Sequence, residues 1–193
     1  QYSTTTTKSI IKRTNSVLRK LNLTDKISIN FINNFHDDDL YINSCANLIK
    51  KYQDKHGKPE KLLLSFHGIP ESYICDEEPY QTQCFVTSKL IAQKLNLQMN
   101  DYETVFQSRF GKSEWIKPYL AERLKKLPTE NIRNVQVFCP GFVADCLETI
   151  EEIGEESHDL FLESKGLKFN FIPCLNNYSD YIEAMIELIR KNV

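Results

Sequence analysis

The sequence has no apolar run that approaches the roughly 20 residues a membrane-spanning helix needs. It also has no excess of one charge sign, because 24 lysines and arginines stand against 26 aspartates and glutamates, for a formal net charge of −2. A strongly basic surface of the kind that binds nucleic acid is therefore not expected. We expect a cytoplasmic protein without a transmembrane segment and without a nucleic-acid partner.

No two of the six cysteines form a C-x-x-C pair. They are scattered along the chain as Cys45, Cys75, Cys84, Cys139, Cys146 and Cys174. This spacing argues against a zinc knuckle and against a thioredoxin-type motif. It also lacks the recognisable set of cysteine ligands that an iron–sulfur cluster needs. We expect reduced thiols, as in a cytosolic protein, and no iron–sulfur cluster.

What the sequence does have is a regular apolar pattern. Hydrophobic residues make up 41% of the 193 residues, enough for one domain or for one large domain with an appendage. Short apolar runs predict strands at 26–32, 61–66, 102–107, 134–139 and 168–173. Helical spacing of apolar residues predicts helices at 4–21, 42–52, 84–95, 120–127, 145–164 and 178–189. Because strands and helices alternate, we expect an α/β fold with a parallel sheet and helices on both of its faces.

A histidine directly follows one of these strands, in the stretch KLLLSFHGIP (61–70). The continuous apolar run is typical of a strand that is covered on both faces. Ligands of open α/β sheets bind beyond the carboxyl ends of the strands, so His67 is expected at the functional edge. By position alone a hydrogen-bonded structural role is an equal alternative, and Gly68 and Pro70 are also consistent with simple loop geometry.

An acidic segment follows the fourth predicted strand. Glu148, Glu152 and Glu156 are four residues apart, so they would share one face of a helix. Asp145 would lie near the same stripe. Such a run is usually a solvated surface, but carboxylates that face a cleft suit a divalent cation or a series of proton acceptors, and imidazole suits iron, zinc or copper. Since both segments leave carboxyl ends of strands in one sheet, His67 and Glu148 are predicted to face each other across one cleft.

Three stretches of the chain closely resemble the ferrochelatase family, whose members insert ferrous iron into protoporphyrin IX. They are SFHGIP (65–70), FQSRFGKSEW (106–115) and CPGFVADCLETIEEI (139–153). The opening QYSTTTT resembles a mid-chain segment of that family, and IPCLNNYSDYI (172–182) resembles its C-terminal asparagine motif. The resemblance therefore extends over essentially the whole chain.

The resemblance implies two similar Rossmann-like halves with a porphyrin cleft between them. Residues 1–35 then correspond to the end of the first half, which is largely missing from this chain, and to the crossover. Residues 36–193 correspond to the C-terminal chelatase half, the second half of a two-domain protein. We therefore expect this chain alone to be an incomplete and inactive fragment of a haem-biosynthesis lyase.

The resemblance also implies roles for single residues. His67 and Glu148 match the pair that faces the porphyrin and is proposed to bind iron or accept protons, so they are the expected catalytic and metal-binding residues. A metal or proton path is implied for Asp145, Glu152 and Glu156. The expected substrates are ferrous iron and protoporphyrin IX, and iron is expected as substrate only.

Several alternatives stay open. Trp115 matches an aromatic residue that lies near the macrocycle, but a packing role is equally consistent. Ser72 stands where the family often has arginine and Glu77 where it commonly has glycine, so the contacts of this loop are open. Histidine and carboxylates do not fix the identity of a metal. The alternatives are therefore a cobalt or nickel chelatase of tetrapyrrole synthesis and a non-catalytic module that binds haem or a metal.

Overall fold

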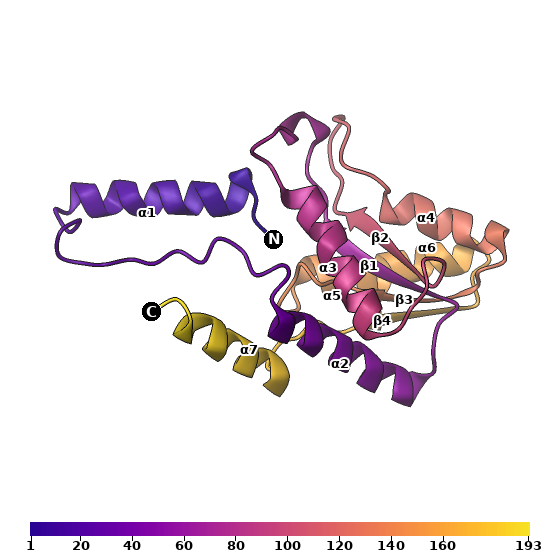
Figure 1. Cartoon of the computed structure of the whole chain (residues 1–193). Coiled ribbons are helices and arrows are strands. Elements are labelled where there is room, and N and C mark those ends of the chain that lie inside the picture. Colours follow the sequence, from indigo (N-terminus) through magenta and orange to yellow (C-terminus); the bar gives the residue numbers. More distant parts are fainter.

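The computed structural model describes all residues from Gln1 to Val193. Its centre is a sheet of four parallel strands: β1 (Lys61–His67), β2 (Tyr102–Gln107), β3 (Asn134–Phe138) and β4 (Lys168–Ile172). The strand order is β2-β1-β3-β4, so β1 lies in the interior while β2 and β4 form the edges. The predicted α/β fold with a parallel sheet is confirmed (Figure 1).

Helices flank and connect these strands. The longer ones are α1 (Ser9–Lys20), α2 (Asp39–His56), α3 (Tyr80–Lys94) and α7 (Ser179–Arg190). The shorter ones are α4 (Leu120–Lys126), α5 (Leu147–Ile150) and α6 (His158–Glu163). Two π-helical turns, η1 (Thr4–Lys8) and η4 (Glu152–Ser157), and two 3-10 turns, η2 (Glu71–Tyr73) and η3 (Leu127–Glu130), complete the set. All predicted helices but the acidic one thus have a counterpart at nearly the predicted place.

Both faces of the sheet are covered by helices, as predicted. On one face Leu62, Leu64 and Phe66 of β1 pack with side chains of α2 and α3 in one apolar cluster. On the other face Leu63 packs with side chains of α4, η4 and α6 in a second cluster. Successive residues of a strand point to opposite faces, so the two layers together require the continuous apolar run of β1. Each leucine buried in this way contributes about 1.5–3 kcal/mol.

The strand predicted at 26–32 is wrong. This segment has no regular structure and pairs with neither edge of the sheet. Its side chains Ile27 and Ile29 are 45% and 38% exposed. An alternating apolar pattern forms a strand only where a neighbouring strand can pair its backbone N–H and C=O groups, and no such neighbour lies beside it.

The single helix predicted at 145–164 is also wrong, because this segment is divided into α5, η4 and α6. Cys146 caps α5: its side chain accepts from the backbone N–H of Thr149, and Thr149 Oγ1 accepts from Cys146 N at 3.0 Å. In η4 the hydrogen bonds reach five residues back, as from Glu156 N to Glu151 O at 2.9 Å. A π-helical turn is rare and occurs frequently at functional sites. The glutamates therefore do not lie along one regular α-helical stripe.

Helix α1 lies apart from the sheet and the helices that cover it (Figure 1). None of its residues is buried, and the apolar side chain of Ile10 is 64% exposed. The residues just before α1 are nevertheless fixed to the rest of the chain. Glu78, which is only 6% exposed, accepts hydrogen bonds from Ser3 Oγ at 3.2 Å and from Thr4 N at 2.8 Å. A buried carboxylate thus holds the chain where η1 begins, ahead of α1.

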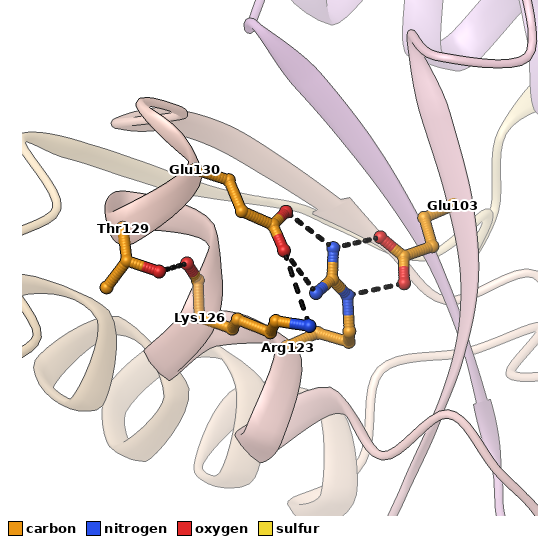
Figure 2. A network of polar contacts seen from close by, with 5 residues as sticks. All are labelled: Glu103, Arg123, Lys126, Thr129 and Glu130. Atoms are coloured by element: carbon orange, nitrogen blue, oxygen red, sulfur yellow. Dashed lines mark hydrogen bonds and ion pairs between the residues drawn. The ribbon is translucent and has the colours of Figure 1, made fainter.

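An ion-pair network joins β2 to α4 and η3 (Figure 2). Arg123 donates to the two carboxylate oxygens of Glu103, from Nε at 2.6 Å and from Nη2 at 3.0 Å. Its Nη2 also donates to Glu130 at 3.0 Å, and Lys126 Nζ lies 3.7 Å from the same carboxylate. Thr129 Oγ1 closes the turn by donating to the carbonyl oxygen of Lys126 at 2.7 Å. The network fixes α4 near the start of β2, at the opposite end of that strand from Gln107.

Candidate active site

His67 is the last residue of β1 and lies at the carboxyl edge of the sheet, where the sequence predicts it. Its Nδ1 lies 2.6 Å from the carbonyl oxygen of Gly68. Because a carbonyl oxygen can only accept, Nδ1 carries a proton, and in the neutral imidazole Nε2 is then the nitrogen with a free lone pair. Tyr80 Oη fixes the backbone by donating to His67 O at 2.8 Å. The half-buried imidazole is thus held in place with one basic nitrogen available.

His67 borders an open pocket of about 450 Å³, which we call the histidine pocket. Its wall contains the aromatic side chains of Tyr73, Phe110 and Trp115. The ring centroids of His67 and Trp115 lie 6.2 Å apart, and those of Phe110 and Trp115 lie 4.9 Å apart with an interplanar angle of 61°. Phe110 is 72% exposed. An imidazole beside aromatic rings suits a flat, largely apolar ligand.

Trp115 is both a wall residue and a packed one. It is 4% exposed, and its backbone N donates to Tyr119 Oη at 3.1 Å. A Cβ at position 68 would lie 3.0 Å from Trp115 Cε3 and 3.1 Å from the carbonyl oxygen of Gln107, so any other residue at position 68 would require these neighbours to shift. The glycine after His67 therefore allows the tryptophan ring to lie directly against the turn.

A second hollow, of about 390 Å³, lies beside the histidine pocket, and we call it the acidic groove. Its lining residues are Ser108, Arg109, Phe110, Leu147, Glu148, Glu151, Glu152 and Glu156. The structure thus brings the three predicted glutamates together even though the helix is interrupted. Phe110 borders both hollows, so the acidic groove and the histidine pocket are neighbours.

Glu148 lies in the first turn of α5. Hydrogen bonds from its own backbone N–H and from the Cys146 thiol lower the pKa of its carboxyl, while partial burial opposes the shift. Glu148 is therefore ionised at neutral pH. Glu148 borders the acidic groove and His67 the neighbouring histidine pocket, so that they face each other across one cleft stays a prediction.

Glu152 is held more tightly than Glu148. Its carboxylate accepts from Ser108 N and from Ser108 Oγ, both at 2.6 Å, and from Gln107 Nε2 at 3.3 Å. Ser108 has a φ of 63°, a left-handed conformation that is uncommon for serine. The carboxylate of η4 therefore fixes the chain as it leaves β2. Glu156, by contrast, is exposed in the same groove.

Asp145 lies outside the acidic groove and faces a different segment. It accepts from Asn176 Nδ2 at 2.7 Å, from Cys174 N at 3.0 Å and from Thr149 Oγ1 at 3.2 Å. Burial raises the pKa of Asp145, but these hydrogen bonds outweigh burial and leave the pKa below its usual value. The expectation that Asp145 shares the stripe of Glu148 is therefore not met, because its side chain ties the start of α5 to the loop after β4.

The two positions that depart from the family pattern lie in the loop between β1 and α3. Ser72 is exposed within η2. Glu77 is exposed and pairs with Lys8, with 2.6 Å between Oε2 and Nζ. The charge at position 77 thus links this loop to η1, next to the contacts that Glu78 makes with the same segment.

No three or more histidine, cysteine, aspartate or glutamate side chains in residues 1–193 gather closely enough to hold a metal ion. His67 and Glu148 are accordingly two separate donors rather than parts of a preformed metal cage. All six cysteines are free thiols. No helix combines the length and the apolar character that crossing a membrane requires.

Sequence reasoning missed one buried residue, which borders neither hollow but is hydrogen-bonded to residues that line both. Gln107, at the end of β2, is 3% exposed and contacts segments from three other parts of the chain. The only signal in the sequence is a long polar side chain at the last position of an otherwise apolar strand. That signal does not reveal which groups form hydrogen bonds with the side-chain amide of Gln107.

Comparison with known proteins finds relatives over the whole chain. A family model described as Ferrochelatase matches residues 1–193. The chain is 44% identical to a ferrochelatase of Marinobacter nauticus over 194 aligned residues, which cover 100% of this chain and 52% of that protein. It is 46% identical to a ferrochelatase of Idiomarina loihiensis over 165 residues, covering 86% of this chain and 45% of that protein. For a ferrochelatase of Pseudoalteromonas atlantica the identity is 43%, with 100% and 53% covered. The chain spans about half the length of the curated relatives it matches.

Proposed function

The chain belongs to the ferrochelatase family, and we propose that it forms the histidine-bearing half of an enzyme that inserts ferrous iron into protoporphyrin IX during haem biosynthesis. The observation that supports this most directly is the arrangement of His67 and Glu148. A free imidazole nitrogen and an ionised carboxylate lie at one edge of the sheet, beside an aromatic-walled pocket.

The shape of the histidine pocket supports a porphyrin as the ligand. A porphyrin is flat and largely apolar, and Phe110 and Trp115 offer aromatic surface beside the imidazole. Small-molecule sites are usually hollows of about 300–1,000 Å³ that are lined mostly by apolar side chains. The pocket of about 450 Å³ falls within this range.

The chemistry of metal insertion requires both kinds of side chain. Two pyrrole N–H protons must leave the macrocycle as the divalent ion enters, so the net charge of the porphyrin core is unchanged. In this proposal His67 accepts one pyrrole proton at Nε2, the nitrogen left free by the hydrogen bond to Gly68, and the second proton passes to water in the open pocket. The glutamates of the acidic groove attract the cation and take over part of its hydration shell, with iron as a substrate.

We also propose that residues 36–193 are the C-terminal half of the protein and that residues 1–35 belong to a crossover from a first half. Helix α1 supports this division. It carries the exposed apolar side chains Ile10 and Val17, is followed by exposed Leu21 at its C-cap, and lies away from the sheet and the helices that cover it (Figure 1). An amphipathic helix normally covers its apolar face. The first half of the longer protein would provide that cover.

The proposal is tested by His67→Ala in the longer protein, with porphyrin metalation followed by fluorescence under anaerobic conditions. We expect kcat to fall by about 100-fold or more, because a positioned acid–base group contributes that much. The matched control is His158→Ala, because His158 lies on α6 and borders neither the histidine pocket nor the acidic groove. Near-normal turnover of His67→Ala would overturn the proposal.

The same assay separates the alternative functions. A higher kcat/KM for cobalt or nickel than for iron would identify a different tetrapyrrole chelatase. Haem binding by the wild-type protein, seen as a Soret band, without insertion of any metal would identify a binding module instead.

A further inference from the structure

A buried glutamine links the segments that carry the two candidate catalytic side chains. Gln107 Oε1 accepts from Ser65 Oγ at 2.7 Å and from the Cys139 thiol at 3.4 Å. Its Nε2 donates to the carbonyl oxygen of Glu148 at 2.7 Å and to the carboxylate of Glu152 at 3.3 Å. The side chain thus connects β1 and the residue that follows β3 on one side with α5 and η4 on the other.

The backbone of the same residue contacts the turn that follows His67. The Cα of Gln107 pairs with that of His67 across β2 and β1. Its carbonyl oxygen accepts from Gly68 N at 2.8 Å. One residue therefore bonds the turn that orients the imidazole and the helix that carries Glu148.

Only an amide satisfies all of these partners. On one side stand two donors, the Ser65 hydroxyl and the Cys139 thiol, and on the other side stand two acceptors. This fixes the orientation of the amide, because the opposite orientation would place two acceptors against each other at Glu148 O. A glutamate would repel both acceptors, and an apolar side chain would leave buried polar groups unpaired.

Helix α5 needs such an external bond. It spans only Leu147–Ile150, and a single helical turn has little stability of its own. Its first turn is held by the cap at Cys146, and the bond from Gln107 Nε2 ties the carbonyl of Glu148 to the sheet. Without that bond, α5 would keep its tie to the loop after β4 through Asp145 but lose its hydrogen bond to β2.

We propose that Gln107 is a positioning residue that sets the separation between His67 and Glu148. The proposal rests on the function proposed above, because the separation matters only if both side chains act on one substrate. Misplacing a reacting group by about 1 Å can reduce a rate by about 100-fold. Gln107 would therefore govern turnover without touching porphyrin or metal.

The test compares Gln107→Met with Gln136→Met in the longer protein. Gln136 is a matched control, because it is 1% exposed and its amide is also bonded at both ends, to Gly57 O at 2.8 Å and by Gln53 Nε2 at 3.1 Å. It pairs with Leu62 near the start of β1, whereas Gln107 pairs with His67 at its end. Each substitution removes a buried amide and leaves its hydrogen-bond partners unpaired. Only Gln107→Met removes a hydrogen bond to α5.

Two measurements are made on each variant: kcat and KM for metal insertion, and hydrogen–deuterium exchange of residues 146–157. For Gln107→Met we expect kcat to fall by about tenfold or more while KM for the porphyrin changes by less than about threefold. Exchange in 146–157 should be faster by about tenfold or more than in the wild type. Gln136→Met should leave both quantities near the wild-type values. If Gln107→Met does not fold, Gln107→Asn, which retracts the amide by one methylene group, replaces it.

Unchanged kcat and unchanged exchange in the Gln107 variant would overturn the proposal, as would equal changes in the Gln136 variant. A wild-type protein that inserts no metal would instead defeat the proposed function. The exchange measurement would then still decide by itself whether Gln107 holds α5.

Discussion

The hydrogen bond between His67 Nδ1 and Gly68 O determines which nitrogen of the imidazole is available to a ligand. It leaves Nε2 as the single nitrogen that can accept a proton or a metal. Glu148 lies at the same edge of the sheet with a lowered pKa, so it stays charged when the imidazole becomes positive. The two residues therefore suit different tasks, proton acceptance and stabilisation of positive charge.

Glu148→Gln separates these tasks, because it removes the charge and keeps the shape of the side chain. We expect kcat for metal insertion to fall by about 100-fold, within the range that acid–base and charge-stabilising groups contribute. Glu156→Gln should have a smaller effect, since Glu156 is exposed at the same groove. The measurement is steady-state metalation of a porphyrin at saturating metal.

The matched control is Glu155→Gln, because Glu155 lies in η4 but borders neither hollow. It should leave the rate unchanged and alter the free energy of unfolding by less than about 0.5 kcal/mol, as for an ordinary surface substitution. Equal and negligible changes in kcat at positions 148, 155 and 156 would mean that the glutamates are only a solvated surface.

At the scale of elements, the central strands could be predicted because their residues are covered on both sides by the chain itself. In β1, Leu64 packs in one apolar cluster and Leu63 in the other, so the continuous apolar run is enough to predict a strand buried on both faces. The segment 26–32 has a similar composition but no strand to pair with, and pairing is a property of tertiary structure. Sequence patterns cannot supply the missing neighbour.

The acidic segment 145–164 also shows that spacing along the sequence cannot predict tertiary contacts. Four-residue spacing predicts one helical face, whereas Glu148, Glu152 and Glu156 border one hollow from α5 and a π-helical turn. The spacing also fails for Asp145, because its carboxylate accepts a hydrogen bond from Asn176, which is 31 residues away in the sequence. The role of Gln107 could not be predicted from the sequence either, because its hydrogen-bond partners belong to several different elements.

Asp145→Asn tests how the start of α5 is joined to the loop after β4. The new amide would face the Asn176 amide, so we expect a loss of about 1–3 kcal/mol in the free energy of unfolding at neutral pH. The pKa of Asp145 is lowered in the folded protein. A carboxyl of this kind stabilises the fold above its unfolded pKa, and the contribution is lost as pH falls through the folded pKa.

Urea denaturation at several pH values measures this contribution. Between about pH 5 and pH 3 the wild type should lose stability more steeply than Asp145→Asn, because the variant has no carboxyl to protonate at that position. Asp54→Asn, a change at an exposed carboxylate on α2, should keep the wild-type slope. Parallel slopes for the wild type and Asp145→Asn would contradict the assigned hydrogen bonds.

At the scale of the whole molecule, the segment before α1 contributes to the candidate site. Thr5 and Thr6 border the histidine pocket, and Glu78 holds the preceding residues by hydrogen bonds from Ser3 and Thr4. The histidine pocket is therefore built partly from residues 1–35, the part that we propose to be the crossover. Any half that packs against the exposed face of α1 would lie next to the same pocket.

This arrangement predicts that the 193-residue chain alone folds but does not catalyse. Its sheet is covered on both faces, so it should unfold cooperatively in urea. A binding site normally encloses about 70–90% of its ligand, and catalysis requires the reactants to be held in register. The histidine pocket is open, and the proposed facing half is not in the chain, so neither condition is met.

We therefore expect zinc insertion into a porphyrin by the isolated chain at less than about 1% of the rate of the longer protein, because the loss of positioning alone can remove this much. Porphyrin fluorescence measures the rate, and circular dichroism with urea denaturation verifies that the chain is folded. Adding the missing half as a separate polypeptide should restore part of the activity if α1 carries the contact surface. A rate within tenfold of the longer protein would show that this chain holds a complete site, and that no second half is needed to hold the porphyrin against His67.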